Sequence, residues 1–463
     1  MQLIHELTQY PDIESVFSCI HEKENAVFLD SSLQNDLGRY SILGLHPYLK
    51  LVQGDTFTIN GKVSAEKFEP FLKKYLKEHQ ERNNTSLPLT SGAIGYFSYD
   101  YGRKKEKVTS RHRLDTDIPD SILVFYDSFI IEDHAAKRMY LISNDHGQDC
   151  QVGMAALKSL IRQAECSCML SGEKSGKIHA DTESHPCLPG TVSANFTKKD
   201  YMDAVQRIIE NIVEGDIYIA NMTQQLQIKS TIKPYEMFRH LRKSNPSPFG
   251  GYFNYGDFQV VCASPERFLQ MKKNHVQTRP IKGTRKRGAT PEEDEALRLE
   301  LEQSGKDQSE LLMIVDLERN DLNRVCIPGS VKVTELFTVE TYATVFHLIS
   351  NITGQLHPDL TIMDLIEAAF PGGSITGAPK LRAMEIIDEL EHSRRNLYTG
   401  SMGYLSLDHD CDFNIVIRTA LFQDGVYHLG VGGGITCESE LEFEYDETLQ
   451  KAKALLEVLN AKI

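Results

Sequence analysis

The order of strand-like and helix-like segments is the feature that most limits the folds open to this chain. Short apolar runs bounded by turn residues, typical of strands, occur at 26–29, 41–44, 57–59, 122–126 and 258–263. Amphipathic segments stand between some of these runs, but without the regular strand–helix–strand alternation of a parallel sheet. No repeat with a period of roughly 20 to 50 residues is present. The sequence therefore predicts an α+β fold with mainly antiparallel sheets.

Three helices in the second half of the chain are marked by their first residues. Thr197 is a candidate cap for a helix that ends near Gly215. Thr290 is followed by proline at the first helical position, and Asp307 is a candidate cap with Glu310 reaching back to it. Later strands are expected at 330–336, 400–407, 413–420 and 426–432.

The longest break in the hydrophobic pattern lies at residues 165–190, which are rich in glycine, serine and proline. We expect a flexible loop or linker there. It separates a β-rich N-terminal part, 1–164, from residues 191–463, which carry most of the motifs, and one core is expected to be continuous across both parts.

The charge balance argues against two classes of partner. The 50 basic and 65 acidic residues give a net charge of -15, which repels nucleic acid phosphates and anionic lipid. No stretch approaches about 18 consecutive apolar residues, and no basic region leads into an apolar run at the N-terminus. We therefore expect no nucleic acid partner, no membrane association and a cytoplasmic location.

Lys282 lies in the segment Pro280–Thr284, a short distance after Glu266. Lysine side chains are mostly solvated, so the position alone favours a surface charge. A lysine withdrawn from water into a pocket is instead a neutral amine that attacks electrophilic carbon. The residues by themselves leave both interpretations open.

Two acidic pairs have the spacing of neighbours on one helix face, Asp307 with Glu310 and Glu444 with Glu447. Two such pairs can converge on a hard divalent cation such as Mg²⁺. The competing interpretation, which spacing alone favours, is a capping box at Asp307 and a solvated acidic run at the other end.

The glycines of Gly432–Gly434 leave room for backbone N–H groups to approach an anionic ligand, or they form a bulge at a strand end. The segment 370–380 is either a tight turn before a helix or a pocket wall. Neither segment has the pattern of a nucleotide-binding loop.

Taken in order, these motifs resemble the chorismate-utilising family, which includes the anthranilate synthase large subunit, aminodeoxychorismate synthase component I, isochorismate synthase and salicylate synthase. The resemblance runs through nearly all of residues 195–460, and its motifs are Gly215–Tyr218, Ser264–Glu266, Pro280–Thr284, Met313–Leu322, Pro371–Lys380 and Gly432–Gly434. It implies a chorismate-utilising enzyme fold, an αβ-sandwich with two large, mainly antiparallel sheets and outer helices.

The resemblance also implies where ligands bind. Glu310 and Glu447 would hold Mg²⁺, with Asp307 and Glu444 acting through bound water, so that the metal grips the ring carboxylate of chorismate. The positions that contact the substrate in the family are Gly283, Thr284, Tyr398, Arg418, Gly432, Gly433, Gly434 and Lys451.

Lys282 distinguishes members of the family. Anthranilate synthases have alanine there, whereas many aminodeoxychorismate synthases have a lysine that attacks C2 of chorismate before ammonia enters at C4. The resemblance thus implies synthesis of 4-amino-4-deoxychorismate for p-aminobenzoate and folate, with Glu266 as general acid/base and His347 near the departing hydroxyl. Ile219 replaces both the lysine base of the water-using members and the glutamine usual in the amine-using ones.

No Gly-x-Cys-x-Gly nucleophile segment is present, so the resemblance implies a separate glutamine amidotransferase subunit that supplies ammonia. An amino-acid effector site is implied by a looser similarity at Ser31, Arg39 and Tyr40. The segment that begins with Asn245 and Pro246 closely resembles the effector-site segment of tryptophan-inhibited anthranilate synthases. The alternative function is therefore that of an anthranilate synthase large subunit in tryptophan biosynthesis.

Overall fold

The computed structural model describes residues 1–170, 189–342 and 345–462, with side chains omitted for 168–170. Its strands are β1 (Leu3–Leu7), β2 (Ala26–Asp30), β3 (Tyr40–Gln53), β4 (Phe57–Ile59), β5 (Lys62–Val63), β6 (Gly92–Phe97), β7 (Ser121–Asp133), β8 (Arg138–Ser143), β9 (Thr191–Ala194), β10 (Ile219–Lys229), β11 (Phe249–Asn254), β12 (Phe258–Ser264), β13 (Arg267–Lys272), β14 (His275–Thr278), β15 (Ile281–Lys286), β16 (Lys332–Thr341), β17 (Val345–Gln355), β18 (Gly377–Ala378), β19 (Ser401–Ser406), β20 (Cys411–Asn414), β21 (Thr419–Gln423) and β22 (Val426–Ile435).

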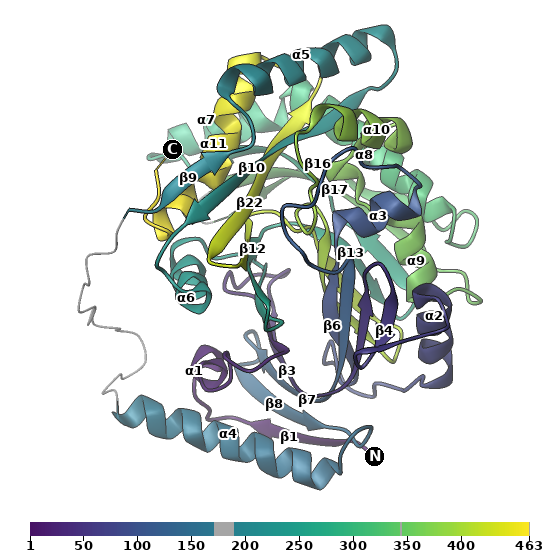
Figure 1. Ribbon diagram of the computed structural model, residues 1–463, viewed down its shortest axis with the longest axis vertical. Coiled ribbons are helices and arrows are strands. Elements are labelled where there is room, and N and C mark those ends of the chain that lie inside the picture. Colours follow the sequence, from purple (N-terminus) through teal and green to yellow (C-terminus); the bar gives the residue numbers. More distant parts are fainter. Residues whose placement is uncertain (171–188, 343–344, 463) are drawn as a thin grey trace.

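The helices are α1 (Ile13–Ser18), α2 (Phe68–Glu78), α3 (Tyr99–Lys105), α4 (Cys150–Leu170), α5 (Lys198–Glu214), α6 (Pro234–Ser244), α7 (Pro291–Glu302), α8 (Gly305–Asn323), α9 (Ile362–Ala369), the 3-10 turn η1 (Gly373–Ile375), α10 (Lys380–Leu390) and α11 (Leu441–Val458). They lie outside the strands, with α5 and α11 near one end of the molecule and α4 at the other (Figure 1).

The described strands join in one hydrogen-bonded network of 22 strands, and neighbours such as β10 with β22 and β3 with β7 are antiparallel. This confirms the α+β prediction. The network is continuous partly because β3 and β7 keep pairing along their length, past a register shift between Pro47 and Leu49.

Strands from the early and late parts of the chain are direct neighbours. β2 pairs with β11, where Asp30 lies opposite Gly250, and β6 pairs with β19, where Phe97 lies opposite Ser401. Residues 165–170 belong to α4, so the expected linker begins too early. The buried positions Met154, Leu157, Ile161 and Ala164 hold this helix against the sheet, whereas residues 171–188 of the expected linker lie outside the described residues.

Local capping signals placed two helices correctly and one incorrectly. Thr197 Oγ1 accepts a hydrogen bond from the N–H of Asp200, and α5 ends at Gly215 in the left-handed conformation. α8, in contrast, begins at Gly305 because Ser304 caps it and accepts from the N–H of Asp307. Asp307 is therefore free to point its carboxylate away from the helix end.

The expected strand 413–420 is also wrong in one respect, since β20 ends at Asn414 and β21 begins at Thr419. Arg418, between them, has a left-handed backbone (φ 49°) that interrupts the pairing. None of the described helices is both long enough and apolar enough to cross a lipid bilayer.

Candidate active site

Lys282 lies where strand β15 meets strand β22 and helix α8. Its Nζ donates a hydrogen bond to the carbonyl oxygen of Ser374 at 3.2 Å, and it forms no ion pair among the described residues. A Cβ placed on Gly434 would lie 3.5 Å from Lys282 Nζ and 3.7 Å from Glu310 Oε2. The glycine therefore leaves open the space between the amine and the carboxylate, and Lys282 is a half-buried group of the site.

A bulge at Gly283 places β15 against α8. The register with β17 shifts between Lys282 and Thr284, and Gly283 has a φ of 69°, which favours glycine. A Cβ there would lie 2.8 Å from Asp307 Cγ. A side chain at position 283 would push the acidic start of α8 away from the strand that carries Lys282.

Glu266 follows β12 and is buried, with 7% of its surface exposed. Burial raises the pKa of its carboxyl group, while the positive charge of Lys282 and hydrogen bonds from the Ser374 side chain and the Ile281 backbone oppose that rise. Glu266 can therefore hold a proton beside the amine, as the expected acid/base role requires.

His347 and Arg418 share the next part of the site. His347 Nδ1 lies 2.9 Å from Thr284 Oγ1. Burial, with a contribution from the Arg418 charge, lowers the pKa of His347 to about 4, so the imidazole is neutral near pH 7. It acts there as a neutral hydrogen-bonding group and not as an imidazolium acid.

Arg418 has no ion-pair partner within the described residues. Burial lowers the pKa of its guanidinium, and the negative charge of Glu266 opposes this. A largely buried guanidinium without a protein carboxylate is suited to a bidentate contact with a ligand carboxylate.

The two acidic pairs meet across the glycine strand. Glu310 on α8 and Glu444 on α11 are buried, and burial raises the pKa of both carboxyl groups. The charge of Glu444 raises the pKa of Glu310 further. A Cβ on Gly433 would lie 2.7 Å from Glu447 Oε2 and 3.3 Å from Glu444 Oε2, so α11 points both carboxylates at β22.

The expected Mg²⁺ ligands are not arranged as a closed ligand shell. In the described ranges, no three His, Cys, Asp or Glu side chains stand close enough together to hold a metal ion. Asp307 is paired with Arg285 at 3.2 Å, and Glu447 with Lys451 at 2.9 Å. The donor chemistry nevertheless fits, because carboxylate oxygens suit Mg²⁺ and a cation would relieve the repulsion between the buried carboxylates.

The remaining expected contacts line strand β22. Lys451 Nζ donates to the carbonyl oxygen of Gly432 at 2.9 Å. The ring of Tyr398 occupies the space beside Gly430, where a Cβ would come within 2.1 Å of Tyr398 Cγ. The glycines at 430 and 432–434 thus admit neighbouring side chains as well as a ligand.

Sequence reasoning missed three supporting groups. Ser374 contacts both Lys282 and Glu266. Lys306 lies 3.8 Å from Glu444. Arg395 is buried in an ion pair with Glu391 and donates to the Ile375 carbonyl at 2.7 Å, which ties it to the same turn as Ser374. The motif 371–380 contained Ser374, but no local pattern indicates which distant groups a serine binds.

A cavity of about 280 Å³, called here the N-terminal cavity, is lined by Ser31, Arg39 and Tyr40 of the N-terminal part together with Pro248 and Asp412 of the later part. Asn245 and Pro246 do not line it. Asn245 is the capping residue that follows the last residue of α6. Pro246 is exposed and lies outside the cavity, whose lining includes Pro248 two residues later.

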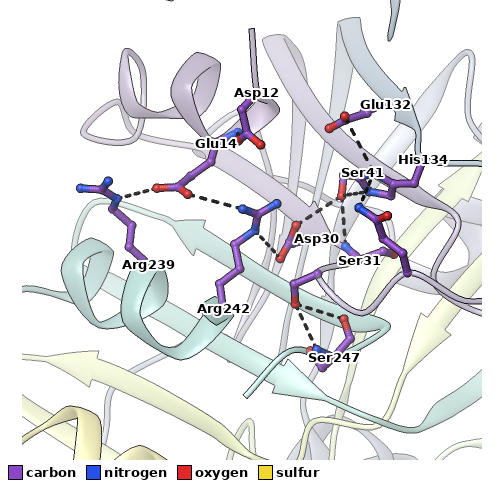
Figure 2. A network of polar contacts seen from close by, with 12 residues as sticks. Asp12, Glu14, Asp30, Ser31, Ser41, Glu132, His134, Arg239, Arg242 and Ser247 are labelled. Carbon is purple, nitrogen blue, oxygen red and sulfur yellow. Dashed lines mark hydrogen bonds and ion pairs between the residues drawn. The ribbon is translucent and has the colours of Figure 1, made fainter. Parts of the chain in front are cut away.

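Figure 2 shows the polar network beside this cavity, where Asp30 joins Arg242 to Ser41. Arg242 Nε lies 3.0 Å from Asp30 Oδ2, and Ser41 Oγ lies 3.3 Å from Asp30 Oδ1. Ser31 Oγ lies in the same region, 2.8 Å from the carbonyl oxygen of Tyr40 and 2.9 Å from that of Pro248.

Comparison with known proteins places this geometry in a family. Residues 27–457 match the family described as chorismate binding enzyme. Aminodeoxychorismate synthase component 1 of Bacillus subtilis is 37% identical over 430 residues, which are 91% of this chain and 89% of that protein. Anthranilate synthase component 1 of Pseudomonas putida is 35% identical, over 95% of this chain and 91% of its own.

Among solved structures, anthranilate synthase component I from Streptococcus pneumoniae superposes with a TM-score of 0.78 at 30% identity, over 92% of this chain and 93% of that chain. The match extends over both the N-terminal part and the residues that surround Lys282. The chain belongs to the chorismate-binding enzyme family.

Proposed function

We propose that this enzyme converts chorismate and ammonia into 4-amino-4-deoxychorismate and water, with Lys282 as a covalent nucleophile. The observation that carries the proposal is the position of the Lys282 amine, held by the Ser374 carbonyl between Glu266 and the glycine strand. Relatives that are 37 to 40% identical to this chain are named aminodeoxychorismate synthase component 1.

The reaction is a pair of displacements. The Lys282 amine first gives a proton to Glu266 and then forms a bond to C2 of chorismate, the ring double bond shifts, and the C4 hydroxyl leaves as water with the proton supplied by Glu266. The attacking nitrogen then returns a proton to Glu266. Ammonia bonds to C4, the double bond shifts back, and Lys282 leaves C2 as an amine with the proton held by Glu266. The surplus proton of the new C4 ammonium restores the starting protonation of the site, so that chorismate plus ammonia balances product plus water.

The substrate is held by groups around Lys282 and strand β22. Arg418 receives a carboxylate, while Tyr398, Thr284, Gly283, Lys451 and the backbone of Gly432–Gly434 shape the rest of the pocket. Mg²⁺, held by Glu310 and Glu447 with Asp307 and Glu444 acting through water, would neutralise the ring carboxylate and supply Lewis acidity. The neutral His347 orients the C4 hydroxyl by hydrogen bonding.

Ile219 supports amination over hydration. Its buried side chain reaches Gly434, where a Cβ would lie 3.4 Å from Ile219 Cδ1, and it offers no base to activate water at that wall. Ammonia is expected from a glutamine amidotransferase subunit, in keeping with the component 1 names of the relatives.

The test is product identification with the purified chain, Mg²⁺, chorismate and an ammonium salt. The expected product by mass spectrometry is 4-amino-4-deoxychorismate, and anthranilate with pyruvate as main products would overturn the assignment. During turnover the intact protein should also gain the mass of the substrate skeleton.

The same assay on Lys282→Ala isolates the nucleophile. We expect the adduct to vanish and kcat to fall by about 10²-fold or more, because direct attack by ammonia must replace the covalent route. Lys286→Ala, on the exposed end of the same strand, is the matched control and should keep the adduct. Equal adduct and equal rate in Lys282→Ala and the unaltered enzyme would exclude the nucleophilic role.

A further inference from the structure

Glu318 is a buried carboxyl group that the proposed reaction does not use. It lies on the inward face of α8 with 9% of its surface exposed, and it forms no ion pair within the described residues. The neighbouring cation, Lys380, is already bound to Asp321 at 2.6 Å and to the Ala369 carbonyl at 3.0 Å. A charge on Glu318 would therefore be buried without a partner.

The hydrogen bonds of Thr278 indicate that Glu318 carries a proton. Thr278 Oγ1 lies 2.8 Å from the carbonyl oxygen of Phe268 and 3.0 Å from Glu318 Oε2. A hydroxyl has one proton, and a carbonyl oxygen can only accept. When Thr278 donates over the shorter distance to Phe268, its oxygen is left to accept a hydrogen bond from Glu318, which can donate only while its carboxyl group is protonated.

Glu318 also stands directly behind the turn that holds the catalytic groups. A Cβ on Gly373 would lie 3.5 Å from Glu318 Cγ. The next residue, Ser374, accepts from Lys282 through its carbonyl and bonds to Glu266 through its side chain. The turn η1 thus has Glu318 on one side and Lys282 with Glu266 on the other.

Burial and two nearby negative charges also favour the protonated form of Glu318. Burial raises the pKa of Glu318 to about 8, and the negative charges of Glu266, from the β12–β13 junction, and of Asp321, on the same helix, add to the rise. The positive charge of Lys380, from α10, opposes the rise. At neutral pH the group is uncharged, and it ionises only at alkaline pH.

We propose that Glu318 is a positioning residue, an uncharged carboxylic acid that supports the Gly373–Ser374 turn from behind and keeps a second negative charge away from Glu266. The role rests on the proposed amination for its effect on catalysis. Ionisation removes the proton that Glu318 donates to Thr278 and raises the negative potential at Glu266, so the enzyme loses activity as Glu318 ionises.

Two variants separate this role from simple packing. In Glu318→Gln the amide N–H donates to Thr278 as the acid does and cannot ionise, whereas Glu318→Ala leaves a cavity. We expect Glu318→Ala to lower kcat by about tenfold or more across the pH range, and Glu318→Gln to restore most of it. In Glu318→Gln the alkaline limb of kcat/KM should move up by about one pH unit or more.

Infrared difference spectra against pH, recorded without substrate, test the protonation state independently of the reaction. The unaltered enzyme should show a protonated carboxyl signal that disappears with a midpoint near pH 8, and Glu318→Gln should lack it. Asp316→Asn is the control, because its carboxyl group is exposed on the same helix and paired with Arg319, and the signal should persist in that variant.

An unchanged infrared signal and alkaline limb in Glu318→Gln would overturn the proposal, as would equal damage in Glu318→Gln and Glu318→Ala. If the enzyme forms a product other than 4-amino-4-deoxychorismate, the proposed function is wrong. The infrared spectra, recorded without substrate, still test the protonation state of Glu318 independently.

Discussion

The active site and the surroundings of the N-terminal cavity contain similar charged side chains, but these side chains have different partners in the two regions. Among the residues that the structure describes, Arg418 of the active site has no ion pair and the Lys282 amine binds only a carbonyl oxygen. Beside the N-terminal cavity, Arg39 binds Asp133 through two hydrogen bonds, and Arg242 bridges Asp30 at 3.0 Å and Glu14 at 3.4 Å.

This difference separates binding groups from structural ones. Withdrawing a charge from water without a partner costs free energy, which a protein recovers when a ligand supplies the opposite charge. Arg418 fits that description, whereas Arg242 already has its partners. We therefore expect substitutions in the active site to affect catalysis and substitutions in the network to affect stability.

The largest effect that bears on this comparison is expected for Arg418→Ala. Loss of a bidentate contact to a substrate carboxylate should lower kcat/KM by roughly 10² to 10³-fold. The melting temperature should not fall, because no protein ion pair is lost. Arg418→Lys keeps the positive charge but not the two-pronged guanidinium, so its rate should be intermediate. A loss of stability in Arg418→Ala comparable to its loss of activity would contradict the distinction between binding groups and structural groups.

Arg242→Ala should show the reverse pattern. Asp30 is 2% exposed, and removing its guanidinium partner leaves a buried carboxyl group that lacks compensation. We expect a decrease of about 3 kcal/mol in the free energy of unfolding, measured in urea, with kcat at saturating ammonium unchanged within about twofold.

The matched control is Arg39→Ala, in which a guanidinium side chain 45% exposed is removed from Asp133. Asp133 is buried, but it also accepts hydrogen bonds from the N–H groups of Ala135 and Ala136, so loss of the exposed arginine should cost less than about 1 kcal/mol. Equal decreases in the free energy of unfolding of the two variants would show that burial does not determine how much Arg242 contributes to stability.

A pH-dependent effect on stability is expected for His146, whose ring contacts Asp127 at 3.2 Å and Glu81 at 2.6 Å. Hydrogen bonds to Asp127 and Glu81 raise the pKa of His146 from 6.5 to about 9. Its stabilisation is therefore fully present below about pH 6.5 and is lost as the pH rises through about 9.

His146→Gln should flatten the pH dependence of unfolding in this window, by about 1 to 2 kcal/mol after allowance for solvent screening. Thermal unfolding at several pH values measures it. An identical pH dependence in His146→Gln would mean that other groups determine stability in this range.

The fold was predictable where local interactions decide it. Thr197 and Gly215 bound α5 because a side-chain cap and a left-handed glycine act within one helical turn. Prediction failed where a neighbour competed. Ser304 takes the cap position expected for Asp307, and the left-handed backbone of Arg418 divides a segment that has the apolar pattern of one strand.

The sequence by itself determined the family motifs, their order, and the presence of a lysine at position 282. Only the tertiary structure decided that Lys282 meets Ser374, that Gly283 bulges toward Asp307, and that Glu318 stands behind the catalytic turn. The reason is physical. Capping and periodicity act between residues close along the chain, whereas burial and ion pairing depend on groups that folding brings together from distant positions.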